Sequence, residues 1–284
     1  MLKHRLFFGT MMTVVLVGLM LFDGWLDTAI DFPIAAGQVS GTLLCLVITV
    51  LAGLAQVELS RLAANVNLKI FKPITIPVTI LLATSWYWGK FTQVTGSEII
   101  IFVGAIGILA IFLYQGFRCG IAGTIGNCGA SCLSILYLGL LSSFVMLIRL
   151  DFGLWALLMF VFTIKSADIG AYTAGSLFGR HKFSPRISPG KTWEGMAGAV
   201  ILAGIVGSIF AGTTDIMSVK AGAVFGVVFA FIGQLGDLAE SMLKRDAEQK
   251  DSSNNVPGFG GILDIIDSPL VAAMPAGLFM RLLS

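Results

Sequence analysis

Long apolar runs separated by short polar segments recur along the whole 284-residue chain. Most of these runs reach the roughly 17 to 25 residues that a helix needs to cross the hydrocarbon core of a bilayer. Helices satisfy all of their own backbone polar groups, which is why they are the usual membrane-spanning element. The pattern predicts an all-α, polytopic membrane protein, a helical bundle with about nine transmembrane helices: 6–23, 36–56, 74–90, 98–117, 131–149, 154–178, 195–212, 220–237 and 265–283.

Two features of the sequence leave open whether the number of helices is nine or differs from nine by one. A run of glycines between residues 120 and 129 blurs the division between the fourth and fifth helices, and Pro269 and Pro275 interrupt the last one. The first apolar run follows Lys3 and Arg5, as a secretory signal would. No small-residue cleavage site closes it, so we interpret it as the first helix.

Composition and charge support this assignment. Hydrophobic residues make up 56% of the chain and charged residues 12%, against about 25% charged in an ordinary soluble domain. With nine spans, most Lys and Arg side chains lie on one side, and the positive-inside rule places that side in the cytoplasm. We therefore expect a multi-pass protein of the cell (inner) membrane, with the N-terminus and the loops 57–73, 180–194 and 238–263 in the cytoplasm.

Two functional classes receive no support from the sequence. The net charge is only +2, and the basic residues lie where topology alone would put them, so we expect no nucleic-acid partner. The cysteines lack metal-ligand spacing and lie in apolar surroundings, so we expect packing roles for them. They are Cys45, Cys119, Cys128 and Cys132.

Ionisable side chains within or at the ends of the spans are concentrated in the second half of the chain. An ionisable group in hydrocarbon costs roughly 2.5 to 3.5 kcal/mol on insertion scales, so such a group is a functional candidate by default. We therefore predict transmembrane scaffold helices over 1–150 and a catalytic region over 151–284. The residues concerned are Lys165, Asp168, Asp237, Asp264 and Asp267.

The sixth span leads directly into the basic loop 180–194. Helical spacing puts Lys165, Asp168 and Tyr172 on one face of this span. The loop offers cations, hydroxyls and Pro–Gly turns that could surround a polyanion such as a phosphate. Two plainer interpretations remain open: a Lys165–Asp168 ion pair that merely tolerates burial, and a loop that is basic for topology alone.

The seventh span carries small residues at four-residue intervals, namely Gly195, Ala199, Ala203, Gly207 and Ala211. Such a stripe lets another helix approach closely, and we interpret it as structural.

Three carboxylates near the end of the chain suggest a cation site. Asp264 and Asp267 are three residues apart, and Asp237 ends the eighth apolar run. An all-oxygen site of this kind suits a hard cation such as Mg²⁺. Helix capping could explain one of the three acids but not all of them. Glu240 and Lys244 fit a surface ion pair of the helix that ends here.

These residues belong to a longer run: Ser241-Met-Leu-Lys244-Arg245, then Lys250-Asp251-Ser-Ser, then Val-Pro-Gly-Phe-Gly260-Gly261, and finally Asp264-Ile-Ile-Asp267. The run resembles the signature of the phosphatidate cytidylyltransferases, also called CDP-diacylglycerol synthases. The stretch Asp168 to Gly195, with Ser188-Pro-Gly-Lys191-Thr192-Trp-Glu, is similar to the same family. Together the motifs cover roughly 165–268, in the family's order and spacing.

The resemblance implies transfer of a cytidylyl group from CTP to phosphatidic acid, with pyrophosphate released, at the cytoplasmic face. It implies one or two cations held by Asp237, Asp264 and Asp267, and it favours a homodimer. The implied catalytic residues are Asp168, Asp237, Lys244, Arg245, Asp264 and Asp267. The implied substrate-binding residues are Lys165, Tyr172, Ser188, Lys191, Thr192, Ser241, Lys250, Asp251, Gly260 and Gly261.

The chain departs from the family pattern at two positions. Phe259 stands where the family has His, and Ile265 stands where it has Arg. Two other functions remain open. One is a related membrane lipid transferase or kinase that resembles polyprenol kinase. The other is an ion-coupled transporter, which would show inverted repeats and broken helices in both halves.

Overall fold

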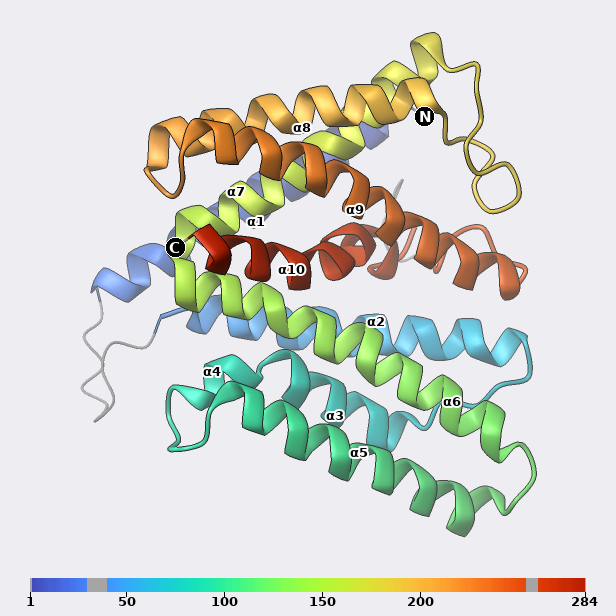
Figure 1. Cartoon of the computed structure of the whole chain (residues 1–284). Coiled ribbons are helices and arrows are strands. Elements are labelled where there is room, and N and C mark those ends of the chain that lie inside the picture. Colours follow the sequence, from blue (N-terminus) through green and yellow to red (C-terminus); the bar gives the residue numbers. More distant parts are fainter. Residues whose placement is uncertain (1, 30–39, 254–259, 284) are drawn as a thin grey trace. The chain divides into compact units, whose positions relative to one another are not determined.

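The computed structural model describes residues 2–29, 40–253 and 260–283 (Figure 1). It contains α1 (Leu2–Ala29), α2 (Thr42–Asn65), α3 (Lys72–Ala83), α4 (Ser85–Gly89), α5 (Gly96–Cys119), α6 (Thr124–Ser134), the π-helix η1 (Ile135–Leu140), α7 (Leu141–Phe178), α8 (Trp193–Thr214), α9 (Val219–Asp246) and α10 (Leu263–Leu283). An isolated bridge pairs Lys182 with Thr192, and none of the described residues is assigned to a β-strand. The predicted all-α fold is confirmed.

Six helical stretches of the described residues are long and apolar enough to cross a membrane. They are α2, α5, the continuous run Thr124–Phe178, α8, α9 and α10. The chain is therefore a multi-pass membrane protein, as predicted, although the predicted count of nine is not confirmed. The fifth and sixth predicted spans lie within one run of 55 residues. Gly153, at φ 88° and ψ 179°, breaks the helical backbone inside that run.

The helices form two compact units. The first contains Met1–Leu150 together with Asp246–Ile265, and the second contains Asp151–Arg245 together with Ile266–Ser284. The segment that connects α9 to α10 therefore packs with the first 150 residues, although it is distant from them in sequence.

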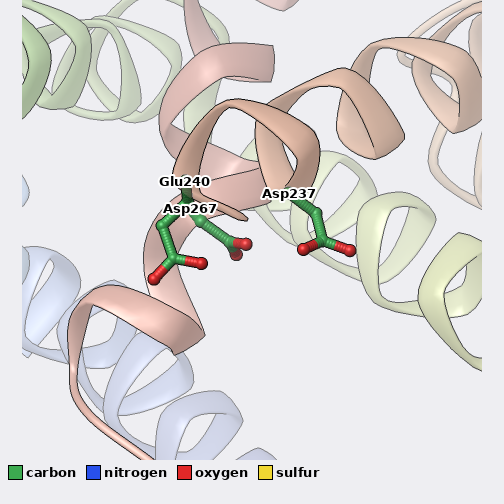
Figure 2. A group of neighbouring side chains, drawn as sticks. All are labelled: Asp237, Glu240 and Asp267. Carbon is green, nitrogen blue, oxygen red and sulfur yellow. The ribbon is translucent and has the colours of Figure 1, made fainter. Parts of the chain in front are cut away.

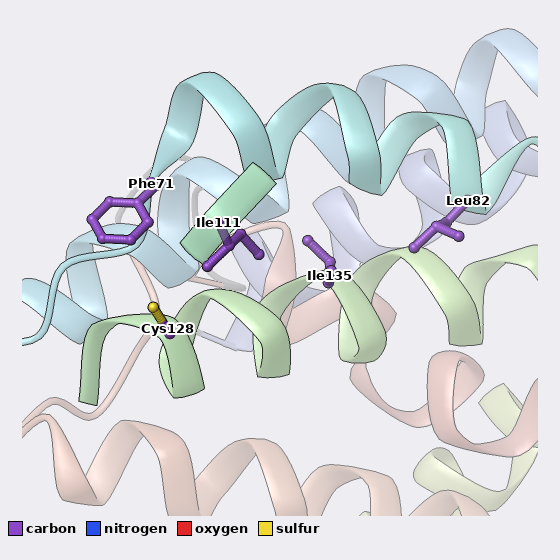
Figure 3. Packing of buried hydrophobic residues seen from close by; sticks show 5 residues of the cluster. All are labelled: Phe71, Leu82, Ile111, Cys128 and Ile135. Carbon is purple, nitrogen blue, oxygen red and sulfur yellow. The ribbon is translucent and has the colours of Figure 1, made fainter. Parts of the chain in front are cut away.

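The core of the first unit lies where α3 packs against α2, α5 and η1. Five buried residues from α5, α6, η1 and both ends of α3 form one cluster: Phe71, Leu82, Ile111, Cys128 and Ile135 (Figure 3). All four cysteines are free, and Cys128 packs within this cluster as the sequence predicted. The cluster joins the central helices of this unit by close packing.

Several buried polar groups in the first unit are satisfied by one another. Gln56 of α2 donates to Ser134 Oγ over 2.8 Å and accepts from Thr79 Oγ1 over 3.2 Å. Arg149 pairs with Asp23 at 2.9 Å and also with Asp27, both at the end of α1. Such pairing is required because an unpartnered polar or charged group in a low-dielectric interior is costly.

The second unit is held together by small residues. Ala167 of α7, Ala199 and Ala203 of α8 and Ala230 of α9 form a buried cluster. The predicted stripe on α8 is buried at all five of its positions. At Gly226 of α9 a Cβ atom would overlap the backbone of Ala203. The structural interpretation of the stripe is thus confirmed.

Candidate functional site

Three carboxylates meet where α9 packs against the start of α10. Asp237 and Glu240 come from one face of α9 and Asp267 comes from α10 (Figure 2). One oxygen from each side chain lies within 4.8 Å of the others. Gly236 permits this approach, because a Cβ atom there would lie only 2.9 Å from the Asp267 carbonyl oxygen. We call these three residues the carboxylate cluster.

The cluster combines burial with one accessible side. Glu240 and Asp267 are buried, whereas the Asp237 side chain is 36% exposed. Lys244 lies 2.5 Å from Glu240, and Lys191 lies 2.7 Å from Asp237. Two ammonium groups thus face three carboxylates. Like charges this close repel one another by a few kcal/mol at an effective dielectric constant of about 20, so these oxygens suit a hard divalent cation.

The basic loop before α8 is anchored at its C-terminal end and at its middle. Thr192 is buried and caps α8, with its Oγ1 accepting from Gly195 N over 3.1 Å. Lys191 also donates to the Gln234 carbonyl of α9 over 3.0 Å. Arg245, from the end of α9, donates to the Ile187 carbonyl over 3.4 Å. The loop is thereby held beside the polar end of α9.

Lys165 and Asp168 form an ion pair at 3.4 Å, and each side chain is about one third exposed. The plainer interpretation as an ion pair is therefore seen in the structure. The same Asp168 carboxylate also lies close enough to Asp237 and Lys191 for their charges to act on it. The pair thus borders the carboxylate cluster. Tyr172, on the same helix, is 63% exposed.

Ser241 and Ser188 take different positions. Ser241 Oγ donates to Asp237 Oδ1 over 3.3 Å and so supports the cluster directly. Ser188 is half-buried within the loop, where its amide donates to the Ser184 carbonyl over 3.0 Å.

Asp264, predicted as a metal ligand, is bonded to its own loop in the first unit. Its Oδ2 accepts from Gly261 N over 2.7 Å and from Ser252 N over 3.0 Å. Gly260 adopts φ +97°, and a Cβ atom there would lie 2.5 Å from this oxygen. The two predicted glycines therefore let the loop close tightly around Asp264. Ile265 follows in the first turn of α10, and Phe259 lies outside the described residues.

Lys250 and Asp251 are exposed and line a polar pocket of about 300 Å³ in the first unit. The other residues that line it are Arg61, Leu62, Asn65, Gln249, Ser252 and Ser253. The pocket thus lies between the end of α2 and the loop that precedes α10.

Two acidic residues had no predicted site role. Glu240 was interpreted as part of a surface pair. Its partner is indeed Lys244, but Glu240 is buried within the cluster. Glu58 was placed in a cytoplasmic loop, whereas α2 continues to Asn65 and buries Glu58. For Glu240, the three-residue spacing from Asp237 was an available signal.

Comparisons with known proteins agree that the chain is similar to cytidylyltransferases. The model of the cytidylyltransferase family matches residues 5–283 of the chain. A phosphatidate cytidylyltransferase of Haemophilus influenzae is 42% identical over 128 residues, which are 43% of this chain and 44% of that protein. A protein of the same name from Bacillus subtilis is 39% identical over 148 residues, 51% of this chain and 55% of that protein. The matched segments span about half the length of these curated relatives.

Proposed function

This chain belongs to the cytidylyltransferase family, and we propose that it transfers a cytidylyl group from CTP to phosphatidic acid. A phosphate oxygen of the lipid attacks the α-phosphorus of CTP. The bond from that phosphorus to the bridging oxygen breaks, and pyrophosphate leaves with the electron pair. The products are CDP-diacylglycerol and pyrophosphate. The attacking phosphate is anionic at neutral pH, so the reaction needs positioning and charge neutralisation rather than a side-chain nucleophile.

The observation that carries this proposal is the carboxylate cluster with its two lysines. Asp237, Glu240 and Asp267 would hold a Mg²⁺ ion, and their all-oxygen donor set fits one. Asp264 remains a proposed further ligand, for a first or a second cation. A bound divalent cation supplies neutralisation of phosphate charge as it develops.

The cations of the chain would act on the triphosphate. Lys191 and Lys244 already lie against the carboxylates, and Arg245 lies against the basic loop. Lys250 lines the polar pocket. We assign these four residues to neutralising the triphosphate and the departing pyrophosphate. Ser188, Thr192 and Ser241 would supply hydroxyls to phosphate oxygens, and Lys165 and Asp168 would border the site.

A membrane location suits the lipid substrate. Phosphatidic acid would enter sideways from the inner leaflet, while CTP would come from the cytoplasm, where the positive-inside rule places the basic loops. The homodimer that the family resemblance favours also remains a proposal.

Product analysis on the purified protein tests the proposal. We expect CTP and phosphatidic acid to give CDP-diacylglycerol and pyrophosphate, EDTA to stop turnover, and Mg²⁺ to restore it. Asp237→Asn and Asp267→Asn should each remove most of the activity. A nucleoside diphosphate product would indicate a kinase instead, and ion flux without nucleotide consumption would indicate a transporter. Near wild-type activity in both variants would contradict the cation site.

A further inference from the structure

Glu58 is a buried carboxylate in α2 that contacts the loop leading into α10. Its side chain is 1% exposed, and it lies in a helix long and apolar enough to span a membrane. Burial of an ionisable group in such a helix costs free energy, so the group is a functional candidate by default. The residues that it contacts belong to the signature run, almost 200 positions later in the chain.

Within the described residues of that loop and α10, three hydrogen bonds join Glu58 to them. Ser253 Oγ donates to Glu58 Oε1 over 2.7 Å. Ser252 Oγ lies 3.1 Å from Glu58 Oε2. Leu263 N, the first amide of α10, donates to the same oxygen over 3.0 Å. The first amides of a helix have no partner within the helix, so a carboxylate there both caps α10 and favours its dipole.

A second carboxylate closes the loop from the other side. Ser252 Oγ also lies 2.8 Å from Asp264 Oδ2, while Asp264 accepts the amides of Ser252 and Gly261. Gly261 passes directly between these groups, and a Cβ atom there would collide with Ser252 Oγ and the Glu58 carboxylate. The loop is therefore fixed at Ser252, Gly261 and Leu263.

We propose that Glu58 is a positioning residue that holds residues 250–253 and 260–264 against α2 and thereby sets the affinity of the protein for the nucleotide triphosphate. This inference rests on the proposed function. Lys250, assigned to the triphosphate, lies two residues before Ser252 and lines the pocket whose other wall is α2. Loosening Ser252 and Ser253 would displace Lys250 from that wall. The consequence would fall on binding of CTP more than on the chemical step.

The test compares two buried, hydrogen-bonded residues of the same helix. Glu58→Gln removes the negative charge that favours the N-terminus of α10 and replaces one of the two acceptor oxygens by an NH₂ group, which accepts no hydrogen bond. We expect the KM for CTP to rise about 10-fold or more while kcat changes less, since a uniform binding contribution appears in KM. We also expect faster trypsin cleavage after Lys250, measured by mass spectrometry of the fragment in detergent. Glu58→Asp should recover part of both properties.

Gln56→Met is the matched control, because Gln56 bonds to Ser134 and Thr79 and to no described residue of the loop. It should lower the Tm while leaving the KM for CTP and the cleavage after Lys250 unchanged. If Glu58→Gln does not fold, Ser253→Ala carries the same two readouts from the loop side. Wild-type values in both readouts would overturn the proposal, as would equal changes in Gln56→Met. If the protein consumed no CTP, the proposed function would fail, yet the rate of cleavage after Lys250 would still test whether Glu58 holds the loop.

Discussion

The Lys191 ammonium lies 2.7 Å from the Asp237 carboxylate and 3.0 Å from the Gln234 carbonyl. Lys191 thus joins the basic loop to α9 at Asp237, the most accessible member of the carboxylate cluster. Lys191 and Gln234 are 43 residues apart in the sequence. The Lys191 side chain is only 10% exposed. A cation so confined can hold the loop and face an incoming anion from the same position.

Removal of this cation should impair turnover. We expect Lys191→Met to lower kcat about 10²-fold, the scale for losing one preorganised electrostatic contact. Lys191→Arg should recover only part, since a planar guanidinium does not reproduce the geometry of an ammonium. Arg186→Gln removes a charge from an exposed position of the same loop and should have little effect. Equal activity of the Lys191 and Arg186 variants would refute the assignment.

Glu240 should affect the requirement for a divalent cation. Glu240→Gln keeps the shape of the side chain but removes a charge from the cluster, so the Mg²⁺ concentration for half-maximal activity should rise about 10-fold or more. The measurement is a Mg²⁺ titration of turnover at saturating CTP. Glu248→Gln, at an exposed position just beyond α9, serves as the control. A titration curve that coincides with that of the wild type would exclude Glu240 from the site.

Close packing of α8 and α9 should be visible in stability. A Cβ atom at Gly226 would overlap the Ala203 backbone, whereas at Gly204 the nearest atom would be 3.8 Å away. Gly226→Ala should therefore cost about 1 to 3 kcal/mol, and Gly204→Ala should be neutral or slightly stabilising. Thermal unfolding in detergent compares the two. A higher Tm for the Gly226 variant would contradict the packing described.

Arg149 should be costly to replace alone. Arg149→Met would leave Asp23, which is 2% exposed, without its charge partner, and breaking such a pair costs about 3 to 5 kcal/mol. Asp23→Asn combined with Arg149→Met should cost less than the sum of the single changes. The free energies of unfolding of the two single variants and the double variant give the coupling energy between Asp23 and Arg149. Strict additivity would show that the pair contributes no interaction of its own.

The sequence predicted those features of the fold that depend on local pattern. Apolar runs predicted a polytopic helical membrane protein, and the four-residue stripe on α8 predicted a close helix contact. The count of nine is not confirmed: the predicted boundary between the fifth and sixth spans coincides with the backbone break at Gly153, but the third predicted span is divided, since α3 has only 12 residues. This division depends on backbone geometry and packing rather than on apolar content.

The site was predictable only where the pattern was local. Asp237 and Asp267 were recognised as intramembrane acids, and the structure brings them together. Glu240 was missed because its i,i+4 spacing from Lys244 is typical of a solvated helix face. The partners of Asp264 include the backbone amides of Ser252 and Gly261, and a backbone amide has no signature in sequence.

The order in which the chain visits its two units limits how the protein can be divided. The polypeptide leaves the first unit after Leu150, returns at Asp246 and departs again after Ile265. No single cut in the gene therefore yields two self-sufficient fragments. A product that stops near residue 150 would contain Glu58 but not Ser252 and Ser253, which form hydrogen bonds with it. We expect split versions to assemble only when both pieces are synthesised together in the same membrane.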